Sequence, residues 1–401
     1  MQRKRRVTLT TLNDDCLLLI CAQLSIKDQF ALLQLNATRL KQLVLQIWQR
    51  KYASSAFDWQ LEPQLKLLSE DEQSLLLGYM SQLTSGLNNL SQGKAVMRWL
   101  LHATQGGGDK LTRLRSLSFV SSQRQVLPLI AQICGNLTQL QLGVCVGVSP
   151  ADVRLLLAAL PRLIVFQLLP AATTTTTASC NCNAEWANME YGQMLQVLQL
   201  PACAICATAK EIAQLPQLQQ LTCFLCNKAS ATATISACLA ALSAQQEAAA
   251  APRQIVALNL QCQFDACMLR LLQRHLGLLR LQRFAWHSKL LLHFDTADGS
   301  IKWLPQRPQV ARAVQQFIVS QLASLHELDF TRNVHATPTF LAHLTAQLNC
   351  KLKGSAAAPT SPLTIWHDGC PNAATDQLET AKDLHYVELQ LQQLTLDQQI
   401  F

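Results

Sequence analysis

Residues 195–226 read LQVLQLPACAICATAKEIAQLPQLQQLTCFLC, and the spacing of apolar residues in this stretch decides the fold. The pattern L-x-x-L-x-L occurs twice in it, with starting points 23 residues apart, at Leu195, Leu198 and Leu200 and then at Leu218, Leu221 and Cys223. A short apolar run of this kind is consistent with a buried strand. Recurrence at a fixed period of roughly 20–50 residues indicates a repeat architecture.

The same pattern recurs along the chain and gives nine clear units in all. The further units are Leu114, Leu117 and Phe119; Leu137, Leu140 and Leu142; Leu163, Phe166 and Leu168; Ile255, Leu258 and Leu260; Leu281, Phe284 and Trp286; Leu325, Leu328 and Phe330; and Leu384, Val387 and Leu389. Leu363 and Ile365 form a weaker unit. The shorter intervals, 23 and 26 residues, match a leucine-rich repeat of roughly 20–29 residues, and the longer ones require insertions.

Helical patterns lie between these units, with apolar residues recurring every three or four positions at Ala151–Leu160, Ala207–Leu215 and Val310–Leu322. A single strand and helix cannot bury their apolar sides alone, so stacked units must share one core. We therefore expect an α/β solenoid over residues 111–401. It should be a curved leucine-rich-repeat array with parallel strands on its concave face.

Three segments interrupt the repeat. Low-complexity sequence near 171–190 and 244–253 predicts two insertions that form surface loops with little order. Between Leu290 and Trp303, Asp298-Gly299 separates alternating apolar residues, which predicts a hairpin.

The cysteines of the quoted stretch offer an alternative, because Cys203-x-x-Cys206 and Cys223-x-x-Cys226 have the spacing of a four-cysteine zinc site. The repeat explains most of them without a metal. Cys223 takes a core position, whereas Cys203 and Cys226 stand ninth from the first leucine, where this repeat type places Asn or Cys in the turn. The same position in two other units is occupied by Cys145 and Asn333. Only Cys206 is left unexplained, so we predict no bound metal or cofactor and keep a zinc-stabilised domain as the minor alternative.

The charge and apolar content of the 401 residues exclude several functional classes. The net charge is +8, but no basic stripe interleaved with aromatic residues follows the cluster at residues 3–6, so nucleic-acid binding is disfavoured. We expect residues 1–10 to be a basic disordered end, although such a cluster can also be a nuclear address or a phosphate contact. The longest apolar region, Leu155–Pro170, is broken by Pro161 and Arg162 and is too short to span a membrane.

The cysteine count and the absence of catalytic motifs narrow the function further. Fifteen cysteines with no cleavable signal before them predict reduced thiols and a cytoplasmic or nuclear protein. The sequence has no phosphate-binding glycine loop, no metalloprotease motif and no nucleophile motif. We therefore predict that the chain is not an enzyme.

The segment 11–59 has a different pattern and predicts three short helices. Asn13 or Asp14 can cap the first helix, Ser25 with Asp28 forms a capping box for the second, and Asn36 can cap the third. A module of this size is marginal alone, and its surplus of apolar residues favours burial against a partner. Residues 60–110 have helical sequence, which we interpret as a helical linker to the first repeat.

This segment resembles the F-box. The matching residues are Leu12, Asp14, Asp15, Leu17, Ile20, Leu24, Asp28, Leu32, Leu35, Arg39, Leu40 and Trp48. With the repeats behind it, the chain is similar to F-box and leucine-rich-repeat proteins. That resemblance implies a substrate-recognition subunit of a cullin–RING ubiquitin ligase, in which the F-box binds the Skp adaptor. The contacts that it implies are Leu12, Leu17, Ile20, Leu24, Leu32 and Trp48.

Strand alternation predicts which residues face a protein substrate. The expected outward positions are neutral in the early repeats, at Gln139, Gln141, Gln167, Gln199 and Gln220. They are charged later, and we take Arg283, His287, Glu327 and Asp329 as candidate substrate contacts. In such a ligase the receptor contributes proximity and other subunits perform the chemistry. The alternative is a leucine-rich-repeat interaction scaffold without ligase association.

Overall fold

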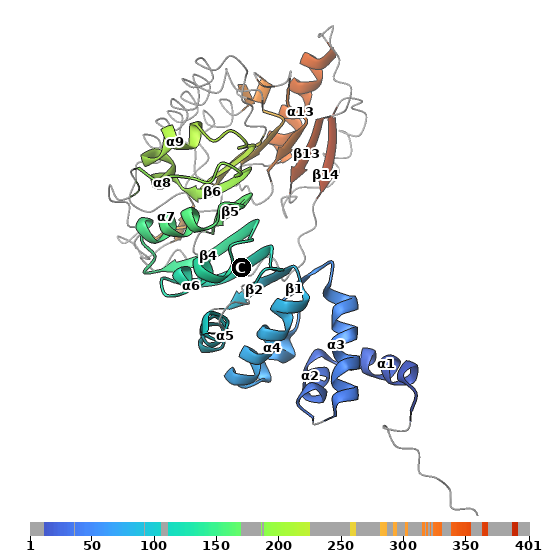
Figure 1. Cartoon of the computed structure of the whole chain (residues 1–401). Coiled ribbons are helices and arrows are strands. Elements are labelled where there is room, and N and C mark those ends of the chain that lie inside the picture. The colour runs from blue at the N-terminus through green and yellow to red at the C-terminus, as the bar shows by residue number, and fades with distance from the viewer. Residues whose placement is uncertain are drawn as a thin grey trace, which may run out of the picture. The chain divides into compact units, whose positions relative to one another are not determined.

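The computed structural model describes the chain as two compact units, residues 1–171 and 172–401, each of which is considered by itself (Figure 1). The described residues are 12–35, 37–91, 93–105, 111–169, 186, 188–224, 257–261, 281–286, 292–294, 301–303, 315–316, 318–319, 321, 324–330, 338–353, 363–367 and 387–391. The predicted basic end, residues 1–10, lies outside them.

Three helices open the first unit, as the sequence predicts: α1 (Asp14–Gln23), α2 (Ile26–Gln34) and α3 (Thr38–Tyr52). The cap of α1 is Asn13, whose side chain accepts a hydrogen bond from the Cys16 N–H at 2.9 Å. Ser25 caps α2 by accepting from the Asp28 N–H at 3.2 Å. The expectation for the third helix is wrong, because the N-cap of α3 is Ala37 and its side chain accepts no hydrogen bond.

A parallel sheet follows in the first unit. Its strands are β1 (Ala56–Asp58), β2 (Gly86–Ser91), β3 (Ser116–Gln123), β4 (Gln139–Val146) and β5 (Val165–Leu168), which pair in sequence order. The 3₁₀ helix η2 (Pro63–Leu67) and the helices α4 (Glu70–Leu83), α5 (Lys94–Gln105), α6 (Val126–Ile133) and α7 (Pro150–Ala159) connect them. Helices α4 to α7 contact one another in sequence order. Each of the strands β1 to β4 is thus followed by a helix of one layer.

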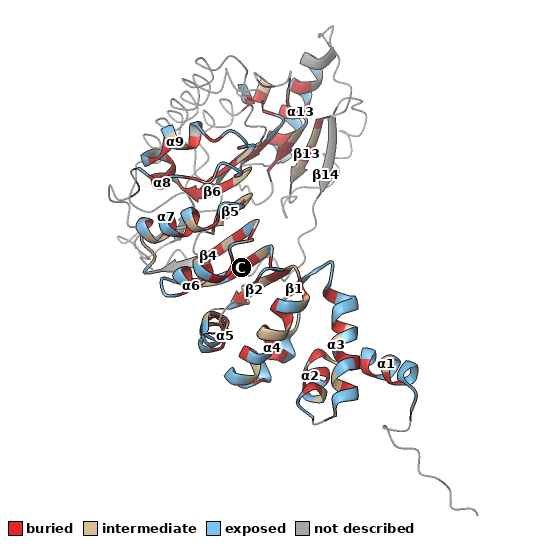
Figure 2. Ribbon diagram, in the orientation of Figure 1, coloured by how far each residue is buried: buried red, intermediate tan, exposed pale blue. Residues whose placement is uncertain are grey.

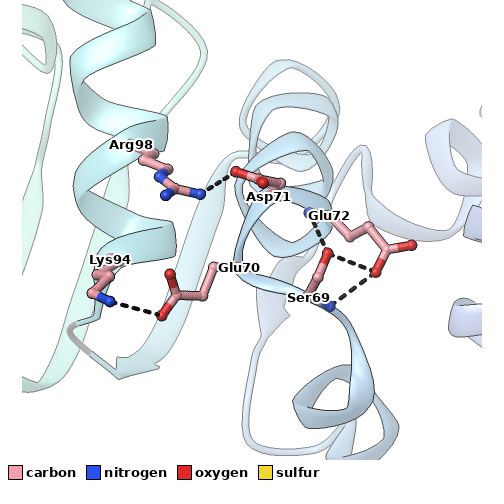
Figure 3. Close-up of polar contacts among 6 residues, drawn as sticks. All are labelled: Ser69, Glu70, Asp71, Glu72, Lys94 and Arg98. Atoms are coloured by element: carbon pink, nitrogen blue, oxygen red, sulfur yellow. Dashed lines mark hydrogen bonds and ion pairs between the residues drawn. The ribbon is translucent and has the colours of Figure 1, made fainter.

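Charged side chains join the first two of these stacked helices (Figure 3). Ser69 and Glu72 form a capping box at the start of α4, in which Glu72 accepts from both the N–H and the hydroxyl of Ser69 at 2.9 Å. The carboxylates beside them cross to α5, where Glu70 pairs with Lys94 at 4.0 Å and Asp71 pairs with Arg98. Exposed pairs of this kind contribute roughly 0–1 kcal/mol each, so burial carries most of the stability of the stack.

The core of the first unit is built from the predicted apolar positions. Leu117, Leu140 and Phe166 are register partners on three neighbouring strands, and each is at most 1% exposed. Leu87 of β2 extends the same row. Each helix carries buried and exposed residues in alternation (Figure 2), as an amphipathic helix over a sheet requires.

The expectation of a helical linker over residues 60–110 is corrected by strand β2, so the parallel sheet begins before residue 111. The sequence of β2 does not show the alternation expected of a strand, because its two core residues, Leu87 and Leu90, are three positions apart rather than two. They pair with Leu117 and Phe119, which are two apart, so β2 contains one extra residue at a β-bulge. Asn89 in this bulge has a φ of 55°, in the left-handed region.

The second unit contains a further parallel sheet of seven strands in sequence order. The strands are β6 (Val197–Pro201), β7 (Gln220–Phe224), β8 (Ala257–Gln261), β9 (Arg283–Trp286), β12 (Glu327–Asp329), β13 (Leu363–His367) and β14 (Val387–Leu391). Helices α8 (Ala202–Ala207) and α9 (Ala209–Ala213) follow β6, and α13 (Pro338–Lys353) follows β12. The hairpin predicted within Leu290–Trp303 is confirmed as the antiparallel pair β10 (Leu292–Phe294) and β11 (Ile301–Trp303).

Register in the second unit also follows the sequence pattern. The central residues of the predicted units pair strand to strand from Leu198 through Leu221, Leu258 and Phe284 to Leu328. The last unit departs from the predicted register, because its central residue Val387 pairs with Leu363, whereas Leu389 pairs with Ile365, the partner of Leu328. The expected α/β class with parallel strands is therefore confirmed. At one of the predicted outward positions the side chain is covered, because Gln199 is only 6% exposed and its register partner Thr222 only 1%.

Two further expectations are corrected. Cys145 lies in β4 and Cys203 in α8, so neither stands in a turn; Cys226 and Asn333 lie outside the described residues. The predicted insertion near 171–190 ends in packed residues rather than in a loose loop, since Trp186 is 7% and Met189 1% exposed. The rest of that insertion, apart from residues 188–190, and all of 244–253 lie outside the described residues. Among the helices that the structure describes, none is long and apolar enough to cross a membrane.

Candidate functional site

An apolar cluster joins the first and the third of the N-terminal helices. Leu17 of α1 meets Leu40 and Leu43 of α3, and these residues are 0%, 9% and 6% exposed. Leu12, Leu18, Leu32 and Ala37 pack against the cluster from its margin. The module buries further apolar side chains besides these, among them Phe30, Leu33 and Trp48, and polar contacts also link the helices.

A buried polar contact supplies one such link. The indole Nε1 of Trp48 donates a hydrogen bond to Oε1 of Gln29 at 2.5 Å, and both side chains are buried. The Nε2 group of Gln29 donates in turn to the carbonyls of Cys21 at 2.8 Å and Leu24 at 3.1 Å, which end α1. One amide on α2 thus joins α1 to α3, and it gives the Leu24 carbonyl at the end of α1 a hydrogen-bond donor.

An exposed ion pair holds the start of the module. Arg39 of α3 donates from Nε to Asp14 of α1 at 2.7 Å and from Nη2 to the carbonyl of Leu12 at 2.7 Å. Because both side chains are exposed, the pair adds little stability. It does fix the position of Leu12 against the apolar cluster.

The six predicted adaptor contacts divide between core and surface. Leu17 and Trp48 are fully buried, so they can serve a partner only by holding the helices together. Leu12, Leu24 and Leu32 are half-buried, and Ile20 is 42% exposed. Leu19, which is 70% exposed beside Ile20, was not among the predicted contacts, and neither was Leu35, which is 53% exposed.

Three of the four predicted substrate contacts come together in the second unit. Arg283 of β9 is the register partner of Glu327 on β12, and Asp329 lies two residues further along β12. Arg283 Nε lies 3.4 Å from a carboxylate oxygen of Glu327, and Nη2 lies 3.4 Å from one of Asp329. The positive charge of Arg283 is therefore balanced by two carboxylates, of which that of Asp329 is nearly buried. His287 lies outside the described residues.

Of the cysteines with zinc-site spacing, Cys223 occupies the core position that the repeat pattern predicts. Cys223 is 4% exposed and pairs in register with the core residue Leu200. Cys203 is also buried, whereas Cys226 and the side chain of Cys206 lie outside the described residues. No group of three or more histidine, cysteine or acidic residues that could hold a metal occurs in the described part of the chain.

A polar hollow of about 180 Å³ lies on the sheet of the first unit, across β2 to β5. Its lining residues are Asn88, Asn89, Ser116, Leu117, Ser118, Gln139, Leu140, Gln141, Val165 and Gln167. Strand alternation predicted the three glutamines as outward positions. The two asparagines were missed, because β2 gives no period-two pattern from which a strand could be recognised.

Comparison with known proteins gives no relative: no protein-family model matches the chain, and no curated protein matches it.

Proposed function

We propose that this chain is a substrate-recognition subunit of a cullin–RING ubiquitin ligase. Its N-terminal helices would bind the Skp adaptor as an F-box does, and its strand-and-helix units would act as leucine-rich repeats that hold a protein substrate. In this role the protein catalyses no reaction itself. It raises the local concentration of the substrate near the ubiquitin-carrying enzyme. The proposal places it in the cytoplasm or the nucleus.

The observation that carries the proposal is the split between core and surface in α1 to α3. A module that existed only to cap the sheet would turn its large apolar side chains inward. Here Leu19, Ile20 and Leu35 remain exposed on short helices whose core is already formed by other residues. Exposed apolar side chains on so small a module support a partner surface there, and the resemblance to the F-box points to the adaptor as the partner.

The test is retention of purified Skp adaptor by the full chain. The double variant Leu19→Asp with Ile20→Asp places charges in the proposed contact without touching the buried cluster, and it should weaken adaptor binding about 30-fold or more. The matched control is Leu155→Asp on α7, where a leucine that is 67% exposed lies outside the module. The control should retain the adaptor fully.

Failure of the unaltered chain to bind the adaptor would reject the ligase proposal and favour a repeat scaffold that acts without a ligase. Equal binding by the double variant and the control would reject the contact assigned to Leu19 and Ile20. Leu17 is unsuitable for this test, because it is 0% exposed and truncation of a buried leucine destabilises a fold by about 2–5 kcal/mol.

A further inference from the structure

The polar hollow of the first unit has an unusual chemical lining. None of the ten described residues that line it is charged and none is aromatic, whereas five carry side-chain amides: Asn88, Asn89, Gln139, Gln141 and Gln167. An ionised ligand would find no counter-charge there, and its desolvation would be uncompensated. A base would find no ring on which to stack.

The amides are arranged in rows because the strands are in register. Ser118, Gln141 and Gln167 are register partners on β3, β4 and β5, and Ser116 and Gln139 form the preceding outward row. Neighbouring strands lie about 4.8 Å apart, so each row presents polar groups at regular intervals. The Ser118 hydroxyl donates to Oε1 of Gln141 at 3.1 Å, which leaves the amide NH₂ of Gln141 to donate elsewhere.

Two of the glutamines have side-chain amides that no other described residue engages. Within the described part of the chain, the side-chain amides of Gln139 and Gln167 have no hydrogen-bond partner. Each amide offers two N–H donors and one carbonyl acceptor. This combination matches a peptide group or a neutral polar side chain, which also donates and accepts at once.

The β-bulge of β2 fixes one wall of the hollow. Asn89 adopts a left-handed backbone conformation, and its Nδ2 donates to Oδ2 of Asp58 at 2.8 Å. The other oxygen of Asp58 accepts from the Gln60 N–H at 2.9 Å. The nearby carboxylate is thus engaged on both sides, and the asparagine is held in a conformation that non-glycine residues rarely adopt. Such strained positions cluster at binding sites.

From this geometry we propose that the hollow binds a short, extended, uncharged segment of a protein partner. This segment carries an asparagine, a glutamine, or an unphosphorylated serine or threonine. The volume, about 180 Å³, is below the roughly 300–1,000 Å³ of sites for drug-sized ligands and cofactors and suits one side chain with its adjacent backbone. The inference rests on the proposed function in that the partner is taken to be the ligase substrate.

The test uses the full chain and a displayed random peptide library as the probe. Selected peptides should be rich in neutral polar residues, and their dissociation constants are then measured by fluorescence polarisation. The variant Gln141→Glu with Gln167→Glu should bind them at least about ten-fold more weakly, because it introduces two carboxylates into a hollow without a cation. The control Gln64→Glu with Gln132→Glu makes the same change in net charge at exposed positions outside the hollow and should bind normally.

A second arm changes the charge of the peptide instead of the protein. Replacing the neutral polar residue of a selected peptide with aspartate or phosphoserine should weaken binding about as much as the double glutamate variant does. The single variant Gln139→Ala, at an exposed position, checks the site with little effect on folding. The proposal is overturned if the selected peptides are mainly charged, or if the Gln141→Glu, Gln167→Glu variant binds them as tightly as the control double variant does. It is also overturned if no peptide binds the unaltered chain more tightly than the variant, or if the chain binds an oligosaccharide array instead of peptides. Adaptor binding is measured separately on the same variants. Loss of adaptor binding would reject the ligase role, and the peptide-binding test of the hollow would still stand.

Discussion

The indole of Trp48 and the amide of Gln29 form the polar centre of the N-terminal module, at 2.5 Å and out of contact with water. Through the same amide, two carbonyls at the end of α1 are also satisfied. A single side chain therefore connects all three helices. Removal of the Gln29 side chain should therefore destabilise the module more than the loss of any one exposed ion pair.

Replacing Gln29 with leucine should destabilise the module by about 2–3 kcal/mol, because it leaves the buried Trp48 N–H unpaired and removes the Gln29 hydrogen bonds to the Cys21 and Leu24 carbonyls. Amide hydrogen exchange of α1 to α3 measures this effect in the full chain, and protection there should fall while that of β3 and β4 is kept. Gln49→Leu, at an exposed position of α3, is the matched control. With Trp48→Phe added, the combined loss should be smaller than the sum of the single losses, since the two residues share one bond.

Gly143 permits the close approach of β3 and β4. A Cβ built there would overlap the backbone carbonyl of Val120 and lie 2.6 Å from the carbonyl oxygen of Phe119. Gly143→Ala should therefore force the strands apart and lower the free energy of unfolding by about 1–3 kcal/mol or more. Gly135→Ala is the control, because nothing lies within 4 Å of its added Cβ. Equal urea midpoints for the two variants would contradict this account of the strand packing.

The capping box of α4 should make stability depend on pH. Hydrogen bonds from the Ser69 backbone and side chain lower the pKa of Glu72 below its ordinary value of 4.5. A lowered folded-state pKa stabilises the fold at pH values above 4.5, and this contribution is lost as the pH falls through the folded pKa. The difference in thermal midpoint between the unaltered chain and Glu72→Gln should therefore shrink on acidification from about pH 6 to pH 3.

Burial should make Cys134 unreactive. Desolvation raises the pKa of its thiol to about 12, so at pH 8 only about one molecule in 10,000 carries the reactive thiolate. Iodoacetamide should label the exposed Cys16 and Cys350 and spare Cys134 until the protein unfolds, which peptide mass spectrometry can measure. Because the folded-state pKa is raised, the stabilisation is complete below about pH 9 and is lost as the pH rises toward 12. Rapid labelling of Cys134 at pH 8 in the folded state would show that this thiol is accessible.

Much of the sheet could be predicted from the sequence, because its strands bury one side and their leucines recur with a fixed spacing. Leu140, Leu198 and Leu221 could be placed on strands in this way, and their pairing partners followed. The pattern fails where the backbone departs from period two. Strand β2 was missed because its bulge moves Leu90 by one residue.

The candidate sites were less predictable, since they depend on contacts between residues far apart in sequence. Nothing local indicates that Gln29 meets Trp48, or that Leu17 lies inside the module and Leu19 outside it. The helical period allows several rotations of so short and apolar a helix. Similarly, the ion pairs of Arg283 with Glu327 and Asp329 depend on strand register, which the sequence supports only through the neighbouring leucines.

The brevity of β1 has a consequence for self-association. It is the terminal strand of the first unit's sheet and spans only Ala56–Asp58, whereas β3 and β4 have eight residues each. An unpaired strand edge is a template on which a second molecule can add its own strand, and short edges limit this polymerisation. With three residues available, β1 offers too little backbone to seed a growing fibril at that end.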